Sequence, residues 1–562
     1  MGRSSIRRLL LLALAASLAL GCHSRHTPAP SAEGTRGMVA TSSPLATEVG
    51  VRMLRDGGNA VDAAVAVSFA LGVVEPWNSG VGGGAFLLVH MTDGRAVAID
   101  GRESAPAKAT RDMYLDPSGQ PTEDSRDGPR AIAVPGAVAA LALAHERYGT
   151  KPWRSLLAPA IDLAREGFPV SARMAGMITL SKLRFRRAPE WSRIFTRAGS
   201  PRLPGARLVQ PDLAQSYERI ATEGSAAFYE GVLGRSIARD VAAQGGILTI
   251  EDLRAYRPIA REPVRGRYRG YEVIAFPPPG GGAQVIETLN LLERFKLSDF
   301  GSGSPQAVHL VAQALAFAFA DRADYAGDPD FVKVPTAGLI SKAYAAERGR
   351  AIRPEGTGKL APSVDPFAFE GGHTTHFSIV DGEGNAVAVT QTINLPFGSG
   401  VVVRGTGIVL NDEMDDFSAK PGVPNAFGLV GAKANEIAPG KRPLSSMSPT
   451  ILLWKGRPRL VLGSPGGPRI ISAVVETIVN AVDFGMGIQA AVDARRFHHQ
   501  WRPDVLFLEK GTPPDLIDAL RAWGHAVEER EAWGSVQAVA IDAQGVRHGG
   551  SDARSGGRAQ AQ

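Results

Sequence analysis

A predicted β-hairpin in the second half of the chain constrains the fold more than any other stretch. Residues 374–380 and 386–394 are rich in β-branched side chains, and they flank the turn-forming sequence Asp-Gly-Glu-Gly-Asn. With the loop centred on this turn, antiparallel pairing places Thr392 opposite Thr374, and Asn394 lies just beyond. One end of the hairpin then collects three polar side chains. Threonine is common in strands for packing reasons, so the hairpin alone does not indicate an enzyme.

Hydrophobic periodicity predicts further helices and strands before the hairpin. Two short apolar runs, 85–90 and 96–100, are expected to be consecutive strands. A helix that begins near Asn59 is expected to stop at Gly72, because glycine commonly ends helices. Helices are also expected at 44–54 and through most of 133–247, where segments such as 136–148, 153–166 and 213–223 have the 3.6-residue repeat of a helix.

Composition and charge narrow the class of protein only slightly. The 562 residues are 44% hydrophobic and 21% charged, which is typical of a soluble globular protein with one large fold or two to three domains. The net charge is +6, but the basic residues are scattered and no nucleic-acid-binding motif is present. We therefore expect no nucleic-acid partner.

Three other motifs have a binding interpretation and a structural one. The glycine run at 80–84 lacks the Lys-Ser/Thr of a P-loop and does not complete G-x-G-x-x-G, so close backbone packing explains it better. Capping and turn roles explain the acidic segment 321–330, and the pair His498-His499 lacks further ligands at useful spacing. We expect neither a metal site nor a cofactor.

The N-terminus has the layout of an export signal. Residues 1–21 carry three arginines and then an apolar run that is too short to span a membrane. Cys22, the only cysteine, follows directly and resembles the lipidated residue of a bacterial lipoprotein, and 22–37 reads as a flexible tether. His23 rather than Asp after the cysteine favours the outer membrane. Ordinary signal cleavage, giving a soluble periplasmic protein, is the alternative.

Five motifs together resemble the γ-glutamyltranspeptidase family of N-terminal-nucleophile hydrolases. The resemblance runs from about Gly37 to the C-terminal region and implies a four-layer αββα sandwich of the α/β (α+β) class. It also implies an enzyme without a cofactor. The motifs are TTHFS, GNAVAVTQTIN, NDEMDDFSAKPG, KRPLSSMSPT and SPGG.

The resemblance implies self-cleavage between His373 and Thr374. A threonine hydroxyl is a weak nucleophile at neutral pH, and the new α-amine, with a pKa of about 8, can act as its base. Cleavage would give a large subunit, 38–373, and a small subunit, 374–562, that together form one fold.

The family also implies roles for other residues in the site. Thr392 accompanies the nucleophile, and the backbone N–H groups of Gly466 and Gly467 form the oxyanion hole. A lid at 424–435 carries Phe427, where close bacterial relatives have tyrosine. The residues implied for the substrate are Arg102, Ser445 and Ser446 for its α-carboxylate and Asn394, Glu413 and Asp416 for its α-ammonium.

The expected substrates are glutathione and other γ-glutamyl amides, with water or an amino acid or peptide as acceptor. A related acylase that prefers glutaryl or poly-γ-glutamyl amides is one alternative, although a glutaryl group has no α-ammonium for Glu413 and Asp416 to bind. A non-catalytic surface lipoprotein that kept the fold for binding is the other.

Overall fold

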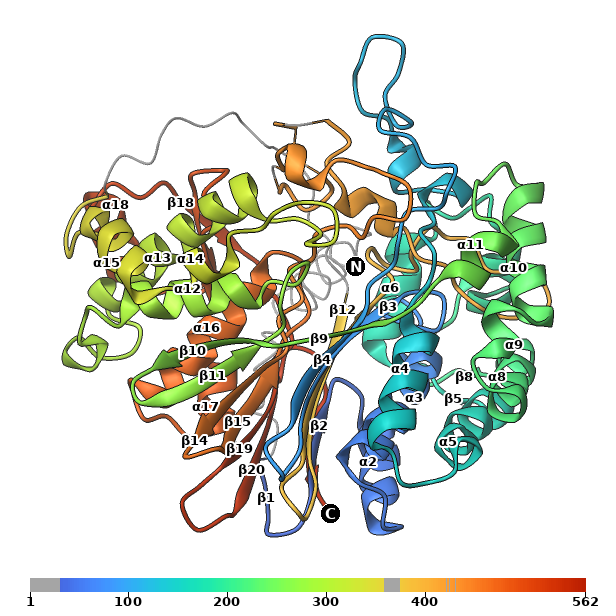
Figure 1. Cartoon of the computed structure of the whole chain (residues 1–562), viewed down its shortest axis with the longest axis horizontal. Coiled ribbons are helices and arrows are strands. Elements are labelled where there is room, and N and C mark those ends of the chain that lie inside the picture. Colours follow the sequence, from blue (N-terminus) through green and yellow to red (C-terminus); the bar gives the residue numbers. More distant parts are fainter. Residues whose placement is uncertain (1–30, 358–373, 421, 424, 430) are drawn as a thin grey trace, which may run out of the picture.

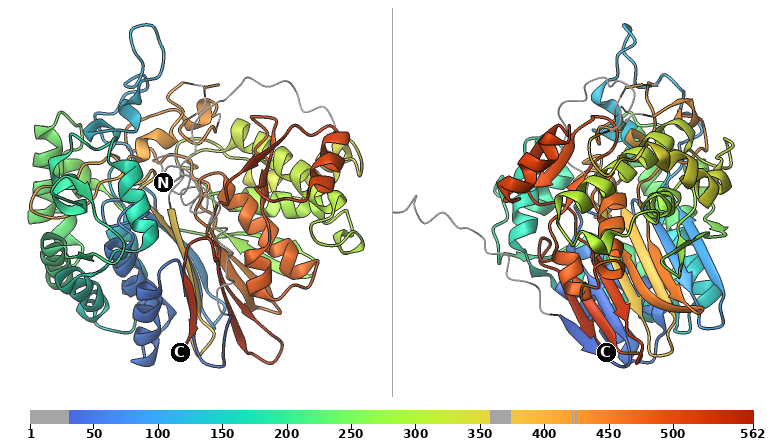
Figure 2. Two further views of the ribbon diagram at one scale, coloured as in Figure 1. Left: turned by 180° about the vertical axis from the view of Figure 1, so that it is seen from behind. Right: turned by 90° about the vertical axis from the view of Figure 1, so that its left-hand side faces the viewer.

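Two seven-stranded sheets lie face to face, and helices cover the outer face of each (Figures 1 and 2). The computed structural model describes residues 31–357 and 374–562, apart from 421, 424 and 430. Cys22, His373, the leader 1–21 and most of the tether lie outside these residues. The four layers, helix, sheet, sheet and helix, are the predicted αββα architecture.

The first sheet, which we call sheet one, contains the predicted hairpin at its centre. All of its neighbouring strands pair in antiparallel fashion, and Thr374 faces Thr392 in the expected register. The second hairpin strand ends at Thr392 and not at Asn394, because Asn394 has a φ of 73°, outside the β region. In order across the sheet, the strands are β21 (Arg558–Ala561), β2 (Met38–Thr41), β12 (Thr374–Val380), β13 (Ala386–Thr392), β3 (Gly84–His90), β4 (Ala96–Gly101) and β9 (Ile259–Arg261).

The second sheet, sheet two, is also antiparallel throughout. It combines strands from the N-terminal, middle and C-terminal parts of the chain. In order, they are β1 (Ala32–Gly34), β20 (Arg547–Ser551), β19 (Gln537–Ile541), β15 (Arg457–Gly463), β14 (Thr450–Trp454), β11 (Tyr271–Ala275) and β10 (Val264–Tyr268).

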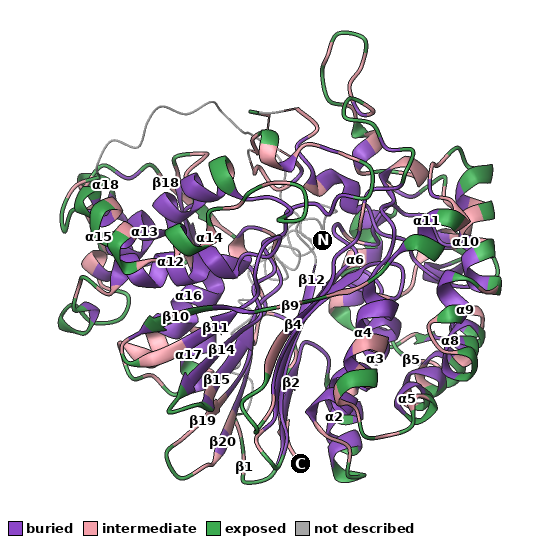
Figure 3. Ribbon diagram, in the orientation of Figure 1, coloured by how far each residue is buried: buried purple, intermediate pink, exposed green. Residues whose placement is uncertain are grey.

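The hairpin strands contribute to two separate hydrophobic cores. Phe377 and Ile379 point to the core between sheet one and its helices, whereas Val380 and Ala388 point to the core between the sheets. This alternation follows from the two-residue period of a strand, and every residue of β12 and β13 is buried. Buried residues accordingly run through both sheets in Figure 3.

Helices of the first half of the chain lie on the sheet-one side. The second helix continues past Gly72 to Val74, so the predicted stop at Gly72 is wrong. Gly72 instead permits close packing, because a Cβ there would lie 2.6 Å from the Tyr217 hydroxyl oxygen. The helices are α2 (Pro44–Arg55), α3 (Ala60–Val74), α4 (Ala137–Tyr148), α5 (Trp153–Glu166), α6 (Ala172–Ser181), α7 (Pro189–Phe195), α8 (Pro211–Glu223), α9 (Ala226–Tyr229), α10 (Val232–Ala243) and α11 (Ile250–Ala255).

Helices of the second half cover sheet two (Figure 1). They are α12 (Gly282–Leu292), α13 (Pro305–Tyr325), α14 (Thr336–Leu339), α15 (Lys342–Arg348), α16 (Arg469–Val482), α17 (Ile488–Asp493) and α18 (Pro514–Ala522). No helix in 31–357 or the described part of 374–562 is long and apolar enough to cross a membrane. Three small sheets complete the fold: β16 (Phe497–His498), β17 (Leu506–Glu509) and β18 (Val527–Arg530); β5 (Phe168–Pro169) and β8 (Arg207–Leu208); and β6 (Thr196–Arg197) and β7 (Ser200–Pro201).

Candidate active site

Thr374 is the first residue of β12, at the end of sheet one where the polar hairpin residues gather. Its hydroxyl donates a hydrogen bond of 3.4 Å to the Thr392 hydroxyl, which also accepts the backbone N–H of Asn394 at 2.8 Å. The side-chain amide of Asn394 donates in turn to the backbone carbonyl of Asp412 at 3.0 Å. These hydrogen bonds hold the Thr374 side chain in place. The residue is also buried, with 6% of its surface exposed.

His376, the third residue of β12, packs between the two sheets. Its side chain lies between the sheets, where its ring nitrogens contact the hydroxyls of Thr390 and Ser378 at 2.8 and 3.1 Å. A Cβ at Gly463 of sheet two would approach the ring to 2.3 Å, so the ring fills the space that glycine leaves. Burial lowers the pKa of His376 to about 3, so the ring is neutral and serves as packing.

The glycine run 80–84 packs against the hairpin end, as its sequence predicts. A Cβ at Gly83 would lie 2.0 Å from the carbonyl oxygen of Thr392, and one at Gly82 would lie 2.1 Å from that of Val409. Any larger residue would displace these backbones. The run therefore sets the position of Thr392.

Arg102 follows β4 and is completely buried among acidic side chains. Its guanidinium forms ion pairs with Glu413 and Asp416 of a short 3₁₀ helix and, at 3.3 Å, with Glu103. It also donates to the carbonyls of Pro443 at 3.1 Å and Leu444 at 3.3 Å. Of the residues that the sequence assigns to a charged substrate head group, Arg102, Glu413 and Asp416 thus bind one another. The others, Asn394, Ser445 and Ser446, line one small cavity together with the two acids.

Burial and charge act in opposite directions on the pKa values of this cluster. Burial raises the pKa of Glu103 to about 7, and it raises those of Glu413 and Asp416, while Arg102 opposes each shift. Burial also favours loss of the proton from Arg102, but its three carboxylate neighbours outweigh that effect and raise its pKa. The cluster therefore holds a permanent cation among carboxyl groups whose charge depends on that cation.

A small cavity joins Thr374 to the charged cluster. Its volume is about 20 Å³, room for a single water molecule, so side chains must move before a larger group can enter. The ring of Phe427 closes one side, and a Cβ at Gly467 would lie 2.8 Å from it. The cavity is lined by Arg322, Thr374, Thr392, Asn394, Glu413, Asp416, Phe427, Leu429, Leu444, Ser445, Ser446, Met447, Gly467 and Ile470.

Gly466 and Gly467 lie between β15 and α16; Gly467 lines the small cavity with Thr374, and Gly466 lines a second cavity that Thr374 also lines. Their φ angles are 130° and 56°, conformations that favour glycine. Neither amide N–H has a hydrogen-bond acceptor within the described residues. Such N–H groups beside a nucleophile can stabilise a developing oxyanion.

Arg322 is a cation in the lining of the small cavity, and the sequence did not predict it there. It lies in the last turns of α13, is buried, and donates to the Ser446 hydroxyl at 3.2 Å. Its Nε finds no acceptor in the described part of the chain. Burial lowers its pKa to about 10, so it remains charged at neutral pH. An arginine that ends a long apolar helical run was the available signal.

Side chains of the acidic segment 321–330 and of the histidine pair form ion pairs and hydrogen bonds with other parts of the protein. Asp321 pairs with Arg348 at 3.0 Å, and Asp330 pairs with Arg261 at 2.6 Å. His498 contacts the Ser472 hydroxyl at 2.6 Å. The described residues contain no group of three or more His, Cys, Asp or Glu side chains that could hold a metal ion.

Comparisons with known proteins show the family of the chain. A sequence model described as Gamma-glutamyltranspeptidase matches residues 46–562. The glutathione hydrolase proenzyme of Escherichia coli (strain K12) is 47% identical over 534 residues, which cover 92% of this chain and 90% of that protein.

Two solved structures resemble the fold. The crystal structure of cephalosporin acylase from Bacillus halodurans has a TM-score of 0.83 and 31% identity, and the match covers 95% of this chain and 97% of that chain. The crystal structure of Helicobacter pylori gamma-glutamyltranspeptidase has a TM-score of 0.56 and 42% identity, and the match covers 56% of this chain and 91% of that chain. From the hairpin site, the sandwich and these matches, we conclude that the chain belongs to the γ-glutamyltranspeptidase family of N-terminal-nucleophile hydrolases.

Proposed function

We propose that Thr374 carries out γ-glutamyl hydrolysis and transfer after the chain cuts itself between His373 and Thr374. The observation that supports this most directly is the position of Thr374, which begins β12 and lines the cavity that ends at Arg102's acidic partners. Cleavage would leave its α-amine beside its own hydroxyl, where the amine can act as base.

The proposed reaction has two acyl-transfer steps. The α-amine of Thr374 accepts the hydroxyl proton while Oγ attacks the γ-carbonyl carbon, and the amides of Gly466 and Gly467 receive the oxyanion. The C–N bond then breaks, and the departing amine takes the proton. Water or an acceptor amine attacks the resulting ester, and Thr374 regains its hydroxyl proton.

The charged cluster favours a substrate head group with both an ammonium and a carboxylate. In the proposed complex, Glu413, Asp416 and the Asn394 side chain bind the α-ammonium, while Arg102, Ser445 and Ser446 bind the α-carboxylate. Glutathione carries this head group, whereas a glutaryl amide lacks the ammonium. We therefore propose glutathione and related γ-glutamyl amides as donors, rather than glutaryl amides.

Electrophoresis and a matched pair of chromogenic substrates test this proposal together. Purified protein should run as two pieces, with a small piece of 189 residues (562 − 373). It should release nitroaniline from a γ-glutamyl anilide and much more slowly from a glutaryl anilide. One uncut piece without activity would indicate a binding protein, and a preference for the glutaryl anilide would indicate an acylase.

Phe427→Tyr tests the lid, in which hydrogen bonds hold the residues on both sides of Phe427. The N–H of Ala426 donates to Asp415 at 3.0 Å, and the Gln500 amide donates to the carbonyl of Gly428 at 3.1 Å. A tyrosine hydroxyl would add one hydrogen bond, with a net contribution of about 0.5–1.5 kcal/mol. We expect KM for a γ-glutamyl anilide to fall about two- to tenfold. An unchanged KM would mean that the existing contacts already set the position of the lid.

Cys22→Ser tests the proposed location of the enzyme. We propose export, with lipid on Cys22 holding the protein at the outer membrane, so that it meets periplasmic or extracellular γ-glutamyl compounds. The substitution should move activity from the membrane fraction to the soluble fraction, or block removal of the leader, without changing turnover. Wild-type protein that is already soluble, with a large subunit that starts elsewhere than an acylated Cys22, would contradict the anchor.

A further inference from the structure

A second, larger cavity opens at Thr374 on the side away from the charged cluster. Its volume is about 640 Å³, enough for a small peptide, and Gly466 lies in its wall. Thr374 is the residue that this cavity shares with the small cavity beside Arg102. A γ-glutamyl amide whose γ-carbonyl carbon lies at Thr374 would therefore place its glutamyl part in the small cavity and its amine part in the larger cavity.

Among the described residues, the charged side chains that line the larger cavity are all arginines. It is lined by Ser171, Ala172, Arg173, Thr374, Pro465, Gly466, Arg469, Ala532, Trp533, Gly534, Arg554, Ser555 and Gly556. This lining contains three cationic side chains and no carboxylate, the reverse of the cavity beside Glu413 and Asp416. Such a lining favours an anionic ligand.

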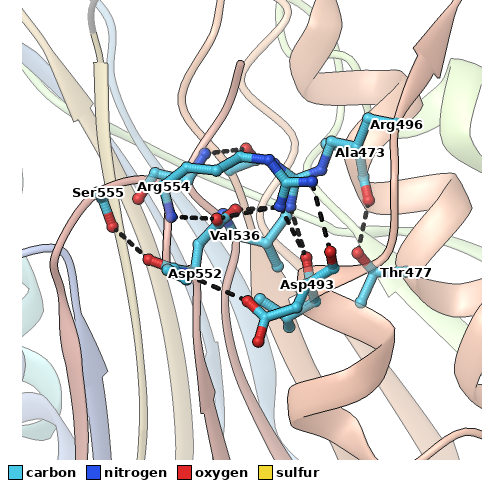
Figure 4. A network of polar contacts seen from close by, with 12 residues as sticks. Ala473, Thr477, Asp493, Arg496, Val536, Asp552, Arg554 and Ser555 are labelled. Carbon is cyan, nitrogen blue, oxygen red and sulfur yellow. Dashed lines mark hydrogen bonds and ion pairs between the residues drawn. The ribbon is translucent and has the colours of Figure 1, made fainter. Parts of the chain in front are cut away.

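Arg554 is committed to the protein itself. It forms ion pairs with Glu509 at 2.7 Å and Asp552 at 3.2 Å, and it donates to three carbonyls at the end of α17. Figure 4 shows this network, in which Asp552 also pairs with Arg496 at 2.6 Å. Because its charge is neutralised here, Arg554 shapes the wall of the cavity and is a poor partner for a ligand.

Arg173 differs from Arg554 in having no ion-pair partner within the described residues. It is the second residue of α6, two residues after the cap Ser171, and it is half-buried in the wall. Its Nη1 is enclosed without a hydrogen-bond acceptor in the described part of the chain. The N-terminal end of α6, which also lines the cavity, adds a favourable field for an anion.

Trp533 and Arg469 also line the larger cavity, and they contact each other. The Arg469 guanidinium lies 5.0 Å from the centre of the Trp533 ring, and Arg496 holds the Trp533 carbonyl at 2.7 Å. The Trp533 side chain is 6% exposed, and its indole N–H has no partner among the described residues. Trp533 and Arg469 therefore shape this part of the cavity wall, and the buried ring leaves little area for a ligand to stack on.

We propose that this cavity binds the amine half of the reaction, and that Arg173 selects amines that carry a carboxylate. The ligands are amino acids and short peptides, which leave as product from a γ-glutamyl peptide or enter as acceptor. Their amine lies at Thr374, and their carboxylate pairs with Arg173. This inference rests on the proposed function of Thr374 and adds the specificity of the leaving and accepting group.

Two anilides that differ by one carboxylate test the assignment. L-γ-glutamyl-4-nitroanilide has a neutral leaving group, and L-γ-glutamyl-3-carboxy-4-nitroanilide has an anionic one. A charge-assisted hydrogen bond supports an effect of about tenfold or more. We therefore expect Arg173→Ala to lower the ratio of kcat/KM for the carboxylated anilide to that for the neutral anilide about tenfold. Arg173→Lys should keep part of the preference.

A matched control separates this contact from general surface charge. Arg187 lies exposed beyond the end of α6 and outside the cavity, so Arg187→Ala removes the same charge from the same region. It should leave the ratio unchanged. An equal ratio in Arg173→Ala and wild-type protein, or an equal fall in Arg187→Ala, would overturn the proposal.

A binding measurement decides the inference even if the function of Thr374 is wrong. Calorimetric titration with glycylglycine and with glycylglycinamide compares the same peptide with and without its carboxylate. Wild-type protein should bind glycylglycine more tightly, and Arg173→Ala should bind the two about equally. Inactivity towards both anilides with this binding pattern would refute the catalytic proposal alone, whereas equal binding by wild-type protein would refute the cavity's assignment.

Discussion

Thr374→Ala is expected to give a protein that folds, stays in one piece and has no measurable γ-glutamyl activity. The alanine has neither the hydroxyl that attacks the bond after His373 nor the hydroxyl that attacks the substrate. Loss of a nucleophile in other acyl-transfer enzymes lowers turnover by a factor on the order of 10⁴ to 10⁶. Denaturing electrophoresis and release of nitroaniline from a γ-glutamyl anilide measure both effects.

Thr374→Ser is the matched control, since it keeps a hydroxyl at the same place. The Thr374 methyl group is buried with the rest of the side chain, so its loss leaves the hydroxyl less constrained. We expect slower cleavage and reduced but measurable turnover. N-terminal sequencing of the small piece should begin at residue 374 in both wild-type and serine proteins. A start elsewhere, or an active uncut protein, would exclude the proposed nucleophile.

Arg102→Lys is expected to raise KM for γ-glutamyl substrates about 100-fold while self-cleavage continues. The guanidinium contacts two acids through separate nitrogens, Glu413 through Nη1 and Asp416 through Nη2, and a single ammonium cannot reproduce that planar arrangement. Cleavage of the chain involves no substrate carboxylate, so its rate should change little. Steady-state kinetics after complete cleavage separates the two properties.

Arg102→Met shows how much of the effect is structural. Removing the cation leaves buried carboxyl groups unpaired, and breaking a buried ion pair costs about 3–5 kcal/mol. Burial already raises the pKa values of Glu413 and Asp416, so both should then bind protons more readily at neutral pH. We expect a lower unfolding temperature for the methionine variant than for the lysine variant. An unchanged KM in the lysine variant would remove Arg102 from substrate binding.

The sequence predicted the features that depend on neighbouring residues. The register of β12 and β13 follows from a short turn between two β-branched runs, and the structure confirms it residue by residue. The predicted packing role is likewise confirmed for the glycines at 82–84, although a Cβ at Gly80 would meet nothing within 4 Å. The resemblance to a known family supplied the αββα layers, which no local pattern specifies.

For features that depend on residues distant in the sequence, the predictions were wrong or were not made. Arg173 comes from α6, and nothing in the sequence distinguishes its cavity-facing cation from the many exposed ones. Arg322 ends the apolar run of α13, but that position does not by itself show which cavity the side chain lines. Gly72 reads as a helix end, but contact with Tyr217 from another helix explains the glycine. The sequence also gave no sign that Arg102 and the acids would bind one another when no substrate is present.

Both sheets combine strands from the two sides of residue 373. In sheet one, β21 and β12 flank β2, and β13 pairs with β3; in sheet two, β1 pairs with β20, and β11 pairs with β14. After the proposed cut, five backbone ladders would join the two pieces, and neither piece would contain all the strands of sheet one or of sheet two. Separation of the pieces is then the same event as global unfolding. Partner exchange between molecules should be as slow as unfolding itself, and a denatured, cut enzyme must reassemble from two chains what the uncut precursor folded as one.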